Sequence, residues 1–176
     1  PERGVRDLLL GTWRGRFGIG VLGLTIFVAI FGNLLAPYDP TDQSVLAKFA
    51  EPVFIDPDSG HLFGGDNLGR DIFSRVLYGG RASLAIGVLA TAIAAVVGSV
   101  LGGIAGFRGG VIDTVIMRLV DLQLSIPFIL LALIFLAVLG PGFWSVFAAL
   151  SVALWVNYAR LIRSETLKIR ETEYVL

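Results

Sequence analysis

The stretch FGGDNLGRDIFSR, residues 63–75, contains the side chains of this chain that are best suited to chemistry. Two carboxylates, Asp66 and Asp71, stand beside two guanidinium groups, Arg70 and Arg75, and glycines flank the group. Such a segment is compatible with a catalytic loop, a metal site or a structural joint in a membrane protein. The first two possibilities require further residues at fixed positions.

The spacing of the surrounding residues argues against a metal or phosphate loop. A calcium loop that begins at Asp56 would place His61 where glycine is needed and Asn67 where glutamate is needed. The segment GGDNLGRD lacks the lysine and the serine or threonine that follow the last glycine of a phosphate-binding loop. We therefore predict no metal site and no cofactor.

The chain also lacks the usual residues of a catalytic centre. It has no cysteine, which removes thiol nucleophiles, thiolate ligands and disulfides. Its only histidine, His61, lies in a polar loop and is interpreted as a solvated residue, with a ligand or proton-handling role as the alternative. A membrane hydrolase needs a nucleophile with a base, or a motif such as His-Glu-x-x-His. We therefore predict that the chain is not an enzyme.

The composition favours a protein that lies in lipid. Hydrophobic residues make up 55% of the 176 residues, charged residues only 16%, and the mean hydropathy is +0.80. A soluble domain has roughly 45 to 50% apolar and about 25% charged residues. The formal net charge is zero, so no basic surplus exists to neutralise the phosphates of a nucleic acid. Membrane lipid, and not nucleic acid, is the expected partner.

Four apolar segments predict an all-α membrane protein, a polytopic helical bundle. The first, residues 18–36, has 19 residues without a charge, or about 28 Å of helix, and is interpreted as a retained anchor rather than a signal peptide. The others are residues 82–107, a helix that begins near Val115 and ends at 139 with a kink at Pro127, and residues 142–159. The short connection at 140–142 makes the last two an antiparallel hairpin.

The positions of Lys and Arg predict the orientation of these spans. Nine of these residues lie in the segment 1–17, in the turn that contains Arg108 and in the tail 160–176. The connection 37–81 has four, against seven acidic residues. Because basic loops stay in the cytoplasm, we predict that both termini are cytoplasmic and that residues 37–81 form an extracytoplasmic loop.

Part of that loop, residues 66–81, has the periodicity of an amphipathic helix. Asp66 is predicted to cap its first amide groups, and Gly79 and Gly80 to end it before the second span. We expect this helix to lie at the outer membrane surface. Its charges either only solvate the helix or pair with one another, or they contact a partner protein outside the membrane. The polar positions are occupied by Arg70, Asp71, Ser74, Arg75 and Arg81.

Two further patterns lie within the spans. Gly98, Gly102 and Gly106 recur every four residues on one face of the second span, which favours close packing of another helix. Arg118 and Asp121 are three residues apart near the cytoplasmic end of the third span, where they are predicted to pair. That pair either fixes the depth of the helix or belongs to a gate or to a contact with a neighbouring subunit.

Four stretches, in order along most of the chain, resemble one family, the permease subunits of ATP-binding cassette (ABC) peptide importers. They are LLAPYDP, FGGDNLGRDIFSRVLYGGRASL, GFRGGVIDTVIMRLVDLQLSIP and YARLIRSETLKIRETEYV. This type of subunit serves the uptake of dipeptides, oligopeptides, glutathione and nickel, and the substrate stays open among these. By this resemblance the signature of the loop consists of Asp66, Gly69, Arg70, Asp71, Arg75 and Arg81.

The resemblance implies a type I importer fold with six transmembrane helices, of which four are expected here, with residues 82–176 as an incomplete transmembrane domain. It implies four kinds of partner: a second permease subunit, two cytoplasmic ATPases that hydrolyse ATP, an extracytoplasmic solute-binding protein and the lipid of a prokaryotic inner membrane. Glu173, Tyr174 and Val175 would open the loop that docks on the ATPase, where the chain is expected to be truncated. The alternative function is an independent channel, a secondary carrier or a membrane scaffold.

Overall fold

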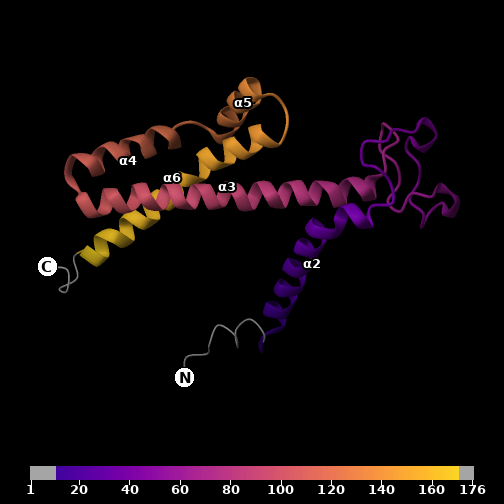
Figure 1. Ribbon diagram of the computed structural model, residues 1–176, viewed down its shortest axis with the longest axis horizontal. Helices are drawn as coiled ribbons and strands as arrows, with labels where there is room; N and C mark the ends of the chain where they lie inside the picture. The colour runs from indigo at the N-terminus through magenta and orange to yellow at the C-terminus, as the bar shows by residue number, and fades with distance from the viewer. Residues whose placement is uncertain (1–10, 171–176) are drawn as a thin grey trace. The chain divides into compact units, whose positions relative to one another are not determined.

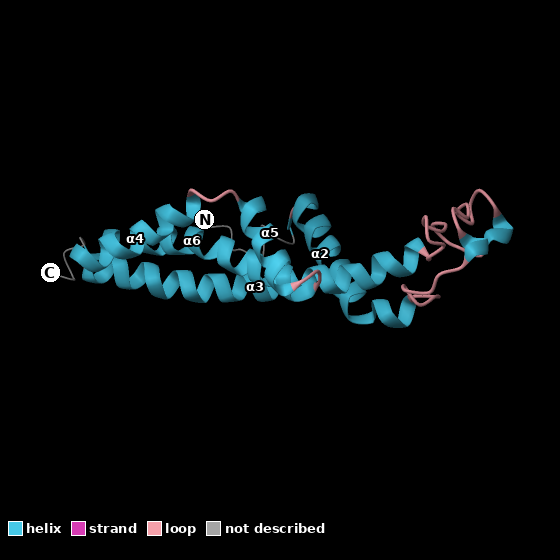
Figure 2. Ribbon diagram, turned by 90° about the horizontal axis from the view of Figure 1, so that it is seen from above, coloured by secondary structure: helices cyan, strands magenta, loops and turns pink. Residues whose placement is uncertain are grey.

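The computed structural model describes residues 11–170. Within that range the chain consists of helices joined by loops and contains no strand (Figures 1 and 2). The α-helices are α2 (Trp13–Leu35), α3 (Ile72–Arg108), α4 (Gly110–Leu124), α5 (Phe128–Leu139) and α6 (Phe143–Arg170). Two short 3-10 helices, η1 (Val45–Ala47) and η2 (Pro57–Ser59), lie in the loop between α2 and α3. The chain divides into two compact units, Pro1–Leu84 and Ala85–Leu176, and each is described by itself.

Three of the helices, α2, α3 and α6, are each long and apolar enough to cross a membrane. The helices α4 and α5 pass the same test only together, and they are bent by 86° at the break between them. If this pair is one broken span, the described residues contain up to four spans. The prediction of an all-α, polytopic membrane protein is confirmed.

In the first unit, α2 packs against the beginning of α3 through glycines. A β-carbon on Gly32 of α2 would lie 3.1 Å from the carbonyl oxygen of Leu77 in α3. On α3, a β-carbon on Gly80 would lie 3.8 Å from the side chain of Val28. The missing side chain of Gly32 thus lets the two backbones approach closely.

Helix α3 is one continuous helix of 37 residues, so the separate amphipathic helix predicted for residues 66–81 does not exist. It begins after Asp71 rather than at Asp66, and it continues through Gly79 and Gly80 into the apolar segment. A glycine in a helix interior costs about 1 kcal/mol relative to alanine, which weakens a helix without ending it. The long apolar run that follows and the contact with α2 outweigh that cost, so the predicted stop at these glycines is wrong.

In the second unit, α6 packs against both α4 and α5. A corner of two glycines, Gly109 and Gly110, joins α3 to α4, and their φ angles of 64° and 57° lie in the region that favours glycine. The buried centre of the unit lies between α4 and α6. It consists of Val120, Val156 and Ala159, each at most 1% exposed, with Met117 and Trp155 packed against it.

The kink predicted at Pro127 is a break between two helices. Helix α4 ends before this residue, and α5 begins at Phe128 with Pro127 in the N-terminal cap position. Proline lacks an amide hydrogen and disfavours helical backbone in the residue before it, so Ile126 is not a helical position. The third predicted span therefore exists only as the bent α4–α5 pair, and that pair begins at Gly110 rather than near Val115.

Candidate functional site

Asp66 is the centre of a hydrogen-bonded turn in the loop between α2 and α3. Its Oδ1 accepts hydrogen bonds from the amides of Leu68 at 2.8 Å and Arg70 at 3.0 Å. Its Oδ2 accepts one from Nε of Arg70 at 2.9 Å and also binds the guanidinium group of Arg75. The Arg70 amide, helped by the Leu68 amide and the Arg70 side chain, lowers the pKa of Asp66 to about 2. Asp66 thus ties this turn to the first turns of α3 and does not cap a helix.

Asp71 caps α3, the role that was predicted for Asp66. Its side chain is buried, and its Oδ2 accepts a hydrogen bond from the amide of Ser74 at 2.7 Å. Its Oδ1 lies 3.0 Å from Nδ1 of His61. Burial raises the pKa of Asp71, but the hydrogen bonds from Ser74 and His61 outweigh it, so the pKa is lowered overall. His61 therefore contacts a buried carboxylate, and its interpretation as a solvated residue is wrong.

Tyr38 connects this pair to the chain that leaves α2. Its amide donates a hydrogen bond to Oγ of the buried Ser74 at 3.1 Å, and its hydroxyl donates one to the carbonyl of Gly60 at 3.0 Å. Its ring lies 4.9 Å from the ring of His61, measured between centroids. The loop is thereby joined to the start of α3 at several points.

Two glycines of the signature stretch allow segments of the loop to touch backbone to backbone. A β-carbon on Gly69 would lie 1.8 Å from the carbonyl oxygen of Ser44, and one on Gly65 would lie 1.9 Å from that of Ala47. The φ angle of Gly69 is 72°, which side chains other than glycine rarely adopt. Any larger residue at either position would push the two segments apart.

The first unit therefore brings together five of the six signature residues. These five residues form a structural joint, because their contacts hold the loop together and attach it to the start of α3. The exception is Arg81, which lies further along α3, exposed and in no ion pair with any residue of the described range. Within residues 11–170 no group of three potential metal ligands lies close enough to hold a metal ion.

In the second unit, the predicted glycine face of α3 lies against α6. A β-carbon on Gly98 would lie 2.4 Å from the Trp155 carbonyl oxygen. On Gly102 it would lie 2.3 Å from the carbonyl oxygen of Ala159, and on Gly106 it would lie 2.7 Å from Cβ of Thr166. The two helices therefore meet at backbone distance over this stretch.

The ion pair predicted between Arg118 and Asp121 is not formed. Asp121 instead accepts a hydrogen bond from the guanidinium group of Arg160 in α6 at 3.0 Å, and about half of each side chain is exposed. Arg118 is exposed and forms no ion pair with the residues that the structure describes. Asp121 therefore pairs with a residue of α6 and not with its neighbour in α4, because α4 and α6 pack together.

A stronger ion pair between the same two helices was not predicted. Arg163 of α6 donates two hydrogen bonds to Asp113 of α4, at 2.5 Å to Oδ1 and 2.6 Å to Oδ2. Arg170 donates to the carbonyls of Gly106 and Phe107 at the end of α3, at 3.3 and 3.4 Å. The residues are 50 and about 64 positions apart in sequence, so no local spacing could reveal these contacts.

A link of two hydrogen bonds within the apolar part of the second unit was also not predicted from the sequence. The indole Nε1 of Trp155 donates a hydrogen bond to Oε1 of Gln123 at 2.7 Å, and the amide nitrogen of Gln123 donates to the carbonyl of Val152. Gln123 lies just before the break between α4 and α5. The link therefore fixes the end of α4 on α6 at the point where the chain turns.

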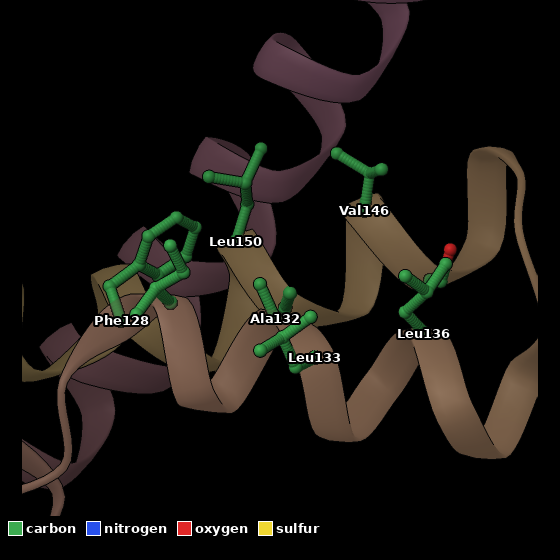
Figure 3. A pocket seen from close by; sticks show the side chains of 9 residues that line it. Phe128, Ala132, Leu133, Leu136, Val146 and Leu150 are labelled. Carbon is green, nitrogen blue, oxygen red and sulfur yellow. The ribbon is translucent and has the colours of Figure 1, made fainter.

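An apolar groove of about 410 Å³ lies between α5 and α6. Figure 3 shows the labelled side chains of Phe128, Ala132, Leu133 and Leu136 on α5 together with Val146 and Leu150 on α6. The groove between α5 and α6 has almost no polar surface that could bind a charged solute. The predicted ATPase-docking residues Glu173, Tyr174 and Val175 lie outside the described residues.

Comparison with known proteins places two parts of the chain in transport families. Residues 98–176 match the family described as binding-protein-dependent transport system inner membrane component. Residues 14–52 match the N-terminal TM domain of oligopeptide transport permease C.

Three curated relatives are similar to most of the chain. The dipeptide transport system permease protein DppC of Bacillus subtilis is 36% identical over 90% of this chain and 48% of its own length. The oligopeptide transport system permease protein OppC of the same organism is 36% identical over 90% of this chain and 50% of its own length. The dipeptide transport system permease protein DppC of Haemophilus influenzae is 34% identical over 89% of this chain and 54% of its own length.

The chain spans about half the length of the curated relatives that it matches. Its apolar helices and both family matches make it a multi-pass membrane protein. We conclude that this chain is similar, over about nine tenths of its length, to permease proteins of dipeptide and oligopeptide transport systems.

Proposed function

We propose that the full-length protein is a membrane-spanning subunit of an ATP-driven importer for peptides or related small solutes. In this function its helices form half of the translocation pathway, and ATP is hydrolysed by separate cytoplasmic subunits. The observation that carries the proposal is the similarity to dipeptide and oligopeptide transport permeases over about nine tenths of the chain.

The second unit provides parts that such a function needs. Importers switch between packings of helices that move as rigid bodies. The glycines Gly98, Gly102 and Gly106 allow α3 and α6 to pack closely, and the break before Pro127 gives the α4–α5 pair a bend at a fixed point. These features support a packed, jointed bundle rather than a single anchor.

The same proposal includes the partners and the orientation. The subunit pairs with a second permease, two cytoplasmic ATPases bind its cytoplasmic side, and an extracytoplasmic solute-binding protein delivers the solute. Both termini of residues 1–176 face the cytoplasm of a prokaryotic cell, and the α2–α3 loop faces outward. The excess of Lys and Arg on the cytoplasmic side supports this orientation. Glu173, Tyr174 and Val175 begin the segment that docks on the ATPase.

Reconstitution tests the function. The full-length subunit is produced with its second permease and ATPases, placed in liposomes and supplied with the solute-binding protein and a labelled dipeptide. We expect uptake that requires ATP. Replacing Glu173, Tyr174 and Val175 together by alanine should reduce co-purification of the ATPases, whereas Ser164→Ala on the exposed side of α6 should not. Uptake without ATP, or unchanged co-purification, would contradict the proposal.

Labelling tests the orientation, and the absence of native cysteine in these 176 residues makes it simple. Leu46 in the α2–α3 loop is 97% exposed and Ile169 near the end of α6 is 54% exposed. A maleimide that does not cross membranes should label Leu46→Cys in intact cells but Ile169→Cys only after permeabilisation. The reverse pattern would overturn the orientation.

A further inference from the structure

We propose that the contacts at the end of α6 are a clasp that makes α3, α4 and α6 move as one body during transport. The clasp consists of the ion pair between Asp113 and Arg163 and of the hydrogen bonds from Arg170 to the carbonyls of Gly106 and Phe107. Asp113 and Arg163 are positioning residues in this proposal, not residues that touch the solute. The proposal rests on the proposed function, because it concerns how ATPase movement reaches the helices.

The geometry of the ion pair restricts rotation of α6 against α4. Both carboxylate oxygens of Asp113 accept a hydrogen bond from one guanidinium group, at 2.5 and 2.6 Å. A fork of this kind fixes the relative direction of two side chains as well as their distance, which a single contact does not. The Asp113 side chain is 17% exposed and that of Arg163 32%, so water competes less here than at the pair of Asp121 and Arg160.

The second part of the clasp binds the end of α3, the other helix that meets α4 at the corner of Gly109 and Gly110. The last carbonyls of a helix have no partner within the helix, and they carry partial negative charge. Arg170 donates to two of these carbonyls at the end of α3. One turn before it, Thr166 lies against Gly106. The end of α6 therefore contacts both helices that meet at the corner of Gly109 and Gly110.

The position of the clasp along α6 links it to coupling. Helix α6 runs without a break from Phe143 to Arg170, and the proposed ATPase-docking residues begin three positions later in the sequence. A displacement applied beyond Arg170 first meets the clasp. With the clasp closed, the displacement carries α3 and α4 along with α6. With the ion pair removed, the end of α6 can rotate against α4 or separate from it without moving α4, and ATP hydrolysis proceeds without transport.

The test measures the solute transported per ATP hydrolysed by the full-length, reconstituted transporter. Asp113→Asn and Arg163→Gln should each lower this ratio about fivefold or more, the range expected for a coupling interaction. Arg163→Lys, which keeps the charge but loses the fork, should give an intermediate value. The exchanged double variant Asp113→Arg with Arg163→Asp should regain part of the loss.

The pair of Asp121 and Arg160 is a matched control. It joins the same two helices and has the same residue types, but it is half exposed and has a single hydrogen bond. Asp121→Asn and Arg160→Gln should leave the ratio within about twofold of the unmodified transporter. A ratio unchanged in the clasp variants, with only their thermal stability lowered, would show that the ion pair is structural and would overturn the proposal. If the unmodified transporter itself shows no ATP-dependent uptake, the proposed function fails, a result distinct from failure of the clasp.

A cross-link tests the same idea without removing the clasp, in case the variants do not assemble. A β-carbon on Gly103 would lie 3.9 Å from the side chain of Ile162, so a short thiol reagent can join Gly103→Cys on α3 to Ile162→Cys on α6. Because the two helices move together in the proposal, the cross-linked transporter should keep its transport per ATP. Loss of transport on cross-linking, reversed by cleaving the reagent, would show relative motion and would overturn it.

Discussion

The carbonyl oxygen of Ala159 lies 2.3 Å from the point where a β-carbon on Gly102 would stand, so α3 and α6 touch backbone to backbone there. An alanine at this position must separate the helices. We expect Gly102→Ala to lower the free energy of unfolding by about 1–3 kcal/mol, the range for overpacking a filled contact. The thermal midpoint of the detergent-purified transporter measures the loss.

The neighbouring glycine provides the control for that experiment. A β-carbon on Gly103 would lie 3.9 Å from the side chain of Ile162, an ordinary van der Waals distance. Gly103→Ala should be neutral or slightly stabilising, because alanine favours the helix. Equal losses for Gly102→Ala and Gly103→Ala would show that the close contact is not what holds the helices.

Removal of the Asp71 carboxylate should loosen the beginning of α3. Asp71→Ala loses the hydrogen bond from the Ser74 amide and leaves His61 without its carboxylate partner. Loss of an N-cap costs about 0.5–2 kcal/mol. Hydrogen exchange of the amides at residues 72–78 should become faster, whereas Asp58→Ala, an exposed carboxylate in the same loop, should leave it unchanged.

The turn around Asp66 should open in acid. The pKa of Asp66 is lowered from 3.8 to about 2, so the folded loop favours the ionised carboxylate. Its contribution to stability is complete above about pH 4 and is lost as the pH falls toward 2. Hydrogen exchange of the Leu68 and Arg70 amides, corrected for the intrinsic rate, should lose protection in that window. Asp66→Asn should be less protected at neutral pH and should show no such transition.

The link between Trp155 and Gln123 should contribute modestly to stability. Trp155→Phe keeps an aromatic ring but removes the indole donor at 2.7 Å from Gln123. Hydrogen bonds within membrane proteins are worth about 0.5–2 kcal/mol, so a small fall in the thermal midpoint is expected. Trp144→Phe is the control, because Trp144 is 69% exposed. A fall that is equal in both variants would assign no role to the hydrogen bond.

The positions of the apolar helices could be predicted from the sequence, because long uncharged segments have few alternatives to a membrane helix. Residues 82–107 lie within α3, and residues 18–36 and 142–159 lie almost wholly within α2 and α6. The glycine pattern at 98, 102 and 106 identified a face of α3, although the sequence did not say which helix would cover it.

The contacts between distant residues could not be predicted. Asp121 was assigned to Arg118 because the two are close in sequence, but the packing of α4 on α6 offers Arg160 instead. The beginning of α3 was misplaced because Asp66 and Asp71 are both suitable caps. Only the fold of the loop decides that Asp66 binds Arg70 and Arg75 while Asp71 receives the Ser74 amide.

The end of α6 is held by two kinds of contact that should respond differently to salt. The contact of α3 with α6 at Gly98 and Gly102 involves no net charge and lies in an apolar segment. The pair of Asp113 and Arg163 is partly open to water, where the screening length falls from about 8 Å at physiological ionic strength to about 3 Å at 1 M. Concentrated salt should therefore fray α6 from Arg170 inward past Arg163, and the fraying should stop at Ala159, where Gly102 of α3 contacts the backbone of α6.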